Sequence, residues 1–245
     1  MPAQFDLSKL SVRQFAERFR GDMIPLSNTF SYFCATAPLS EEDLKEYLQE
    51  PIASLPPSVS SVLPKVSLML VPYLERGGGD FVCIEKPPEN RLSWASQLRL
   101  DKEEVLLFAL QGQEVAEYHY RLYHLLAQFM GDLWSDEARQ RYSALIREEL
   151  FARAHGEVDE DSWRLKQELL RRQNSFRKDT KLFRDYVRQS FVDTLTLYLH
   201  GICCDIDVET GPRQVRSRYL RNRLNLLQEL YPPPKGYAVF PEQGA

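Results

Sequence analysis

The stretch QEVAEYHYRLYHLLAQFMGDLW, residues 113–134, indicates the fold class. Its apolar side chains recur at steps of three and four positions: Val115, Tyr118, Leu122, Leu125, Phe129 and Leu133. That spacing puts them on one face of a helix, where they can pack against a core. We therefore predict a long helix over residues 113–134, in a protein whose second half is mostly helical.

The same helical period continues beyond this stretch. It predicts a helix over about 136–154, ended by Gly156, and a last helix over about 215–230 that stops before three prolines. Between them, residues 159–200 form either one very long helix or two helices joined near Asn174 and Ser175. The run from Ile202 to Glu209 alternates apolar and polar side chains, which predicts a strand.

The first half has shorter and more varied segments. We predict a helix over 8–20 and a short helix after Ser40, whose following acids suit a helix start. The apolar runs 66–74 and 81–84 flank three glycines, Gly77 to Gly79, which is typical of a β-hairpin. Two further strands are expected over 92–98 and 105–110. Together these segments predict a small antiparallel sheet within residues 60–112.

These elements define an α+β fold that is predominantly helical. The small antiparallel sheet lies in the N-terminal half, and the long helices make up the C-terminal half. We expect a single domain over residues 1–245, with a mixed α/β lobe at about 1–111 and a helical lobe at about 112–245. No flexible linker separates the two lobes near residue 111.

Composition excludes several classes of protein. Apolar residues make up 43% of the chain and charged residues 27%, with a net charge of −4, so neither disorder nor a nucleic-acid-coating protein is expected. No apolar run approaches the roughly 20 residues of a membrane helix, and the first ten residues do not resemble a signal peptide. The missing membrane helix means that we expect no membrane partner. The four cysteines have no disulfide-framework spacing, so we expect a cytoplasmic protein.

Charge is divided unevenly along the second half. Residues 101–161 hold 14 acidic and 6 basic side chains, whereas residues 162–223 hold 14 basic and 7 acidic ones. One interpretation is that acidic and basic helices face each other inside the protein. The other is a basic surface for an anionic partner. The candidate anion-binding residues are Arg213, Arg216, Arg218, Arg221 and Arg223.

The predicted strand over 202–209 carries a second candidate site. Asp205, Asp207 and Glu209 would share one face of it, about 6.6 Å apart. Carboxylates in this arrangement can bind Mg²⁺ or Mn²⁺ and position a phosphate group, with the nearby arginines holding its oxygens. The alternative is an edge strand with a charged, solvated face, which discourages aggregation.

Two enzyme families share this short pattern. The segment CDIDV, residues 204–208, resembles the DxD strand of haloacid-dehalogenase-type phosphatases, and DIDV is similar to the paired-acid strand of nucleotidyltransferases. The first family implies a large α/β domain after the motif, but 36 residues follow Glu209. The second implies a glycine pair shortly upstream, which residues 192–196 lack. We therefore assign the chain to neither family.

Two residues of the helical half interrupt apolar faces. Asp193 lies within a helix that should be buried, so it needs a partner. That partner is expected to be an arginine of another helix, unless Asp193 is a perturbed acid that lines a pocket. His119 is expected to be a hydrogen-bonded core residue rather than a catalyst.

Two functions follow from these features. The first is a non-catalytic binding or scaffolding protein that uses its basic C-terminal surface against a protein or a phosphate-bearing ligand; nucleic acid is the less favoured partner. The second is a metal-dependent enzyme acting on a phosphate ester, centred on Asp205, Asp207 and Glu209, with Mg²⁺ or Mn²⁺ as its cofactor. No catalytic residue and no other cofactor can be assigned from the sequence.

Overall fold

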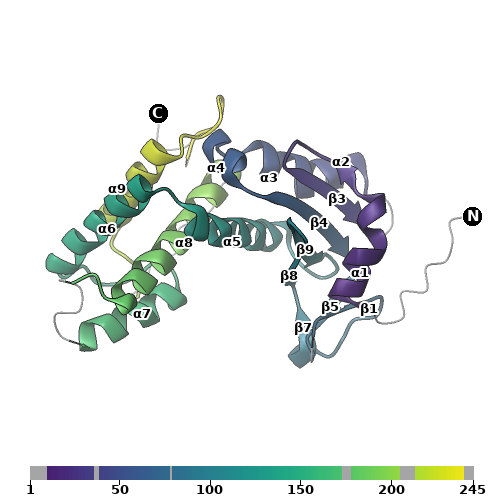
Figure 1. Cartoon of the computed structure of the whole chain (residues 1–245), viewed down its shortest axis with the longest axis horizontal. Coiled ribbons are helices and arrows are strands. Elements are labelled where there is room, and N and C mark those ends of the chain that lie inside the picture. Colours follow the sequence, from purple (N-terminus) through teal and green to yellow (C-terminus); the bar gives the residue numbers. More distant parts are fainter. Residues whose placement is uncertain (1–9, 36–38, 78, 173–177, 205–212, 240–245) are drawn as a thin grey trace, which may run out of the picture. The chain divides into compact units, whose positions relative to one another are not determined.

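The structure is a computed structural model that describes residues 10–35, 39–77, 79–172, 178–204 and 213–239. It confirms the α+β class, with two sheets in the first half and long helices in the second (Figure 1). The chain divides into two compact units. One comprises residues 1–51 and 63–121, and the other comprises residues 52–62 and 122–245. This division falls ten residues after the expected lobe boundary at 111, and it assigns the segment 52–62 to the helical unit.

The first unit is built on a five-stranded sheet. Its strands follow the order β2 (Ile24–Pro25), β3 (Phe30–Cys34), β4 (Lys65–Val71), β9 (Glu103–Ala109) and β8 (Ala95–Leu100). The three central strands β3, β4 and β9 are parallel, and the two outer pairings are antiparallel. The predicted antiparallel sheet is therefore wrong for the centre of this sheet, and β3 was not predicted at all.

The sequence of the two inner strands explains their parallel pairing. The buried part of β4 is an unbroken run of apolar residues and one serine, Val66–Val71, and β9 buries five consecutive apolar residues, Val105–Ala109, after Glu104. Strands covered on both faces have continuous apolar sequences, whereas half-exposed antiparallel strands alternate apolar and polar residues. The two runs therefore indicate a sheet with both faces covered.

A second, four-stranded sheet is antiparallel throughout. It has the order β1 (Leu10–Ser11), β6 (Phe81–Cys83), β5 (Tyr73–Glu75) and β7 (Leu92–Ser93). The pairing of β5 with β6 confirms the predicted hairpin around the glycines. Pro72 separates β4 from β5, which is where its missing N–H would interrupt a ladder.

Short helices surround these strands. Helix α1 (Val12–Phe19) begins with a capping box between Ser11 and Gln14, and its Phe19 ring stacks on Phe33 of β3 at 4.6 Å. The predicted start at Ser40 is confirmed by a second capping box, from which α2 (Glu41–Leu44) runs through a π-helical turn, Lys45–Gln49, into α3 (Glu50–Ala53). Short 3-10 turns lie at Arg20–Asp22 and Glu89–Arg91. His119 is buried and its Nε2 lies 2.9 Å from the Glu46 carbonyl oxygen, as expected for a bonded core residue.

The second unit contains the long helices. They are α5 (Val115–Leu133, whose first turns belong to the first unit), α6 (Asp136–Phe151), α7 (Glu160–Arg171), α8 (Lys181–Cys203) and α9 (Ser217–Leu230), together with the short α4 (Pro57–Val62). Residues 159–200 thus hold two separate helices, α7 and α8. Helix α8 is buried over most of its length, as the sequence predicted for Asp193 and its neighbours. It also extends to Cys203, so the predicted strand cannot begin at Ile202.

No helix within the described ranges combines the length and the apolar composition needed to span a membrane.

Candidate functional site

The carboxylates of the predicted acidic strand, Asp205, Asp207 and Glu209, lie outside the described residues. The structure therefore gives no geometry for the Mg²⁺ or Mn²⁺ hypothesis.

The five candidate arginines fall into two groups. Arg213, Arg216, Arg218 and Arg221 are exposed at and before the first turns of α9. Arg213 lies 3.2 Å from Glu160, and the Arg218 guanidinium lies 4.4 Å from the centre of the Tyr219 ring. Arg223 differs from them because it is completely buried. It belongs to the interior of the helical unit and cannot take part in an exposed anion-binding surface.

Arg223 is the centre of a buried ionic cluster. Its guanidinium contacts Glu149 through Nε at 3.0 Å and Nη2 at 2.6 Å, and it contacts Glu157 through Nη1 at 2.7 Å and Nη2 at 3.1 Å. The Lys166 ammonium donates to Glu157 at 3.1 Å and to the Gly156 carbonyl at 2.7 Å. All four charged residues are at most 2% exposed. Two positive and two negative charges thus balance each other inside the unit.

Neutral hydroxyl groups complete the bonding of this cluster. Arg223 Nη1 also lies 3.0 Å from the Ser190 hydroxyl of α8, and the Tyr186 hydroxyl donates to Glu157. Burial alone would raise the pKa of Glu157, but the charges of Arg223 and Lys166 and the hydrogen bonds from Arg223 and Tyr186 outweigh it and lower the pKa to about 2. The cluster joins α6, α7, α8 and α9 and is closed to solvent, so we assign it a structural role.

Asp193 is a buried acid with neutral partners. It is 3% exposed, and it accepts hydrogen bonds from the Ser162 backbone N–H at 3.3 Å and from the Gln189 side-chain amide at 2.8 Å. Its bonded partners are therefore these two amides rather than the arginine expected from the sequence. Burial raises the pKa of Asp193 to about 6, and the hydrogen bonds from Ser162 and Gln189 only partly oppose this effect.

This raised pKa predicts a measurable dependence of stability on pH. Between pH 4 and 6 the folded state binds more protons at Asp193 than the unfolded state does, so the free energy of unfolding contributed by Asp193 falls as the pH rises. The shift corresponds to at most about 3 kcal/mol. Urea titrations at several pH values in this range measure the free energy of unfolding of the wild type and of Asp193→Asn. The difference between the two free energies should change with pH by up to about 3 kcal/mol. A constant difference would contradict the prediction, and comparing the two proteins cancels the contribution of every other group.

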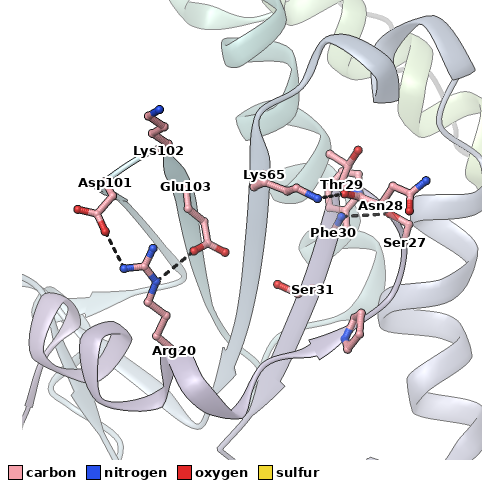
Figure 2. A pocket seen from close by; sticks show the side chains of 11 residues that line it. Arg20, Ser27, Asn28, Thr29, Phe30, Ser31, Lys65, Asp101, Lys102 and Glu103 are labelled. Carbon is pink, nitrogen blue, oxygen red and sulfur yellow. Dashed lines mark hydrogen bonds and ion pairs between the residues drawn. The ribbon is translucent and has the colours of Figure 1, made fainter.

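The first unit contains an open cavity of about 510 Å³ at the amino ends of the parallel strands (Figure 2). It is formed by four segments: the 3-10 turn that begins at Arg20, residues 25–31 from β2 into β3, the start of β4, and the turn between β8 and β9. Nine of its eleven lining residues are polar or charged: Arg20, Ser27, Asn28, Thr29, Ser31, Lys65, Asp101, Lys102 and Glu103. The sequence carries no local signal of this site, because its residues are brought together only by the strand pairing.

Comparison with family models, with curated proteins and with solved structures gave no match. The assignment of function therefore depends on the geometry of the chain itself.

Proposed function

We propose that the protein is a non-catalytic binding protein that uses the exposed arginines at and before the start of α9, Arg213, Arg216, Arg218 and Arg221, to bind an anionic partner, a protein or ligand bearing carboxylates or phosphates. The cytoplasm is the proposed location, since the four cysteines lack the sequence spacing of a disulfide framework. The observation that carries the proposal is that Arg216 and Arg221 are exposed without an ion-pair partner within the described ranges.

The position of these arginines on the helix supports the proposal. The amino end of a helix carries a partial positive charge, which favours acids and disfavours bases in the first turn. Helix α9 has no acid in its first turn and no side-chain cap at its N-cap residue Arg216, yet Arg218 lies in the first turn and Arg221 follows in the second. This arrangement does not stabilise the isolated helix. It does concentrate positive potential on one surface, where guanidinium groups and free backbone N–H groups can bind an anion.

Retention on a polyanion column, eluted by a salt gradient, tests the proposal. We expect the wild type to be retained at low salt, and the variant carrying Arg213→Gln, Arg216→Gln, Arg218→Gln and Arg221→Gln to elute at clearly lower salt. The matched control removes four exposed arginines that are each paired with an acid three or four positions away in the sequence: Arg13, Arg139, Arg164 and Arg172. Both variants lose the same net charge. Equal elution of the two variants, or no retention of the wild type, would refute the proposal.

A further inference from the structure

The cavity of the first unit has walls of opposite charge. Lys65 of β4 and Glu103 of β9 are paired in register on neighbouring strands. In the described structure, however, no ion pair joins them. Lys65 turns toward the loop before β3 and donates to the Asn28 carbonyl, whereas Glu103 turns toward Arg20 and Ser67 (Figure 2). The two side chains therefore diverge and leave the cavity between a positive and a negative group.

The wall around Glu103 carries a net negative charge. Arg20 lies 2.7 Å from Asp101 and 3.5 Å from Glu103, so one guanidinium faces two carboxylates. Lys102 does not offset the difference, since its side chain extends away from the other labelled residues (Figure 2).

Hydrogen-bond directions make the same wall an acceptor surface. The Glu103 carboxylate can only accept, so the Ser67 hydroxyl donates to it. Ser67 then accepts from the Ser31 hydroxyl, whose oxygen lies 3.0 Å away. With its proton directed to Ser67, Ser31 presents lone pairs to the cavity. A ligand group at this wall must therefore be a donor, and a cation suits the charge.

The opposite wall is a donor surface. The Ser27 hydroxyl oxygen accepts the backbone N–H groups of Thr29 at 3.2 Å and of Phe30 at 3.0 Å, which leaves its own proton for a ligand. The Lys65 ammonium uses one of its three protons on Asn28 and has two more to donate. An anionic acceptor fits between these two groups.

We infer that the cavity binds a small zwitterion of the amino-acid class, with its carboxylate at Lys65 and Ser27 and its ammonium at Ser31 and Glu103. The volume lies within the range of small-molecule sites, roughly 300–1,000 Å³. The polar lining disfavours an apolar ligand, and the opposed charges disfavour a ligand of one sign.

Calorimetric titration of the full chain with individual amino acids tests this inference. Each amino acid that binds is compared with the matching amine, which lacks the carboxylate, and with the matching acid, which lacks the amino group. We expect saturable binding of at least one zwitterion and about tenfold or greater weakening for both analogues, because each loses a charge-assisted contact. Absence of binding by every amino acid up to millimolar concentration would overturn the inference, as would equal binding of an analogue.

Substitutions in the cavity locate the binding. Lys65→Met and Glu103→Gln should each weaken binding about tenfold or more, whereas Lys86→Met, at an exposed lysine of the same unit that does not line the cavity, should leave it unchanged. Thermal melting shows whether a charge substitution disturbs folding. If it does, Ser27→Ala tests the same site with a smaller change, because it removes a single hydroxyl group. Full binding by Lys65→Met and Ser27→Ala would overturn the assignment. This outcome is independent of the arginine surface on α9, which these variants leave intact.

Discussion

Replacing Arg223 with methionine is expected to lower the free energy of unfolding by about 3–5 kcal/mol. The substitution leaves Glu149 and Glu157 buried with only the Lys166 ammonium to balance them. Glu149 then loses its bidentate partner and has no access to water, since it is 2% exposed. A buried carboxylate without its partner carries a desolvation penalty that methionine cannot offset. Urea unfolding of the full chain measures the change.

Two comparisons make this prediction specific. Arg221→Met changes the same residue type on the same helix at an exposed position, and it should alter stability by less than about 0.5 kcal/mol. The double variant Arg223→Met with Glu149→Met removes one charge of each sign and leaves Glu157 paired with Lys166. It should therefore recover much of the loss, because a balanced apolar replacement of a buried ion pair is often tolerated. If Arg223→Met alone is as stable as the wild type, the cluster does not hold the helices together.

The burial of Arg223 could have been found in the sequence. Leu220, Arg223 and Leu227 follow the helical period of three and four, so Arg223 lies in phase with the apolar face of its helix rather than with Arg221. Glu149 is in phase with Tyr142 and Ile146 in the same way. Charged residues at such positions predict a buried ion cluster. Grouping Arg223 with its sequence neighbours by residue type obscured that signal.

Local patterns predicted the helices but not the sheet pairing. The period of residues 113–134 is a property of one segment, and it gave α5 within two residues at either end. Strand pairing depends on segments far apart, as between Ser31 and Ser67, and nothing within either segment specifies the partner or its direction. The cavity follows from that pairing, since it places Lys65 beside Glu103. Its donor and acceptor walls therefore could not be read from the sequence.

Replacing Gly156 with alanine is expected to cost about 4 kcal/mol or more, which is exceptional for one methyl group. Gly156 has a φ of +81°, a conformation that costs other residues about 1–2 kcal/mol. In addition, its Cβ would overlap the carbonyl of Gln214 and would lie 2.6 Å from the Val215 nitrogen. Those are backbone atoms of a segment held by hydrogen bonds from Glu157 to Arg213 and from Val215 to Glu157. The two segments must separate to admit the methyl group.

Gly236→Ala separates the two causes of this loss. Gly236 has a similar φ of +92°, but no atom lies within 4 Å of its Cβ position, so its substitution reports the backbone cost alone. Unfolding experiments should therefore show a much smaller loss for Gly236→Ala. Equal losses would mean that the contact with Gln214 is not what requires glycine at position 156.

The position of Gly156 beside Glu157 also links this prediction to the ionic cluster. Separating the 156–157 backbone from Gln214 displaces Glu157 from Arg223 and Lys166, so part of the cost of Gly156→Ala is the loss of those ion pairs. In a protein that already carries Arg223→Met, that part has been lost beforehand. The two substitutions should thus cost less together than the sum of their separate effects, by about 1 kcal/mol or more. Strict additivity in a double-mutant cycle would show instead that glycine is required at position 156 only by the close contact with the backbone of Gln214 and Val215.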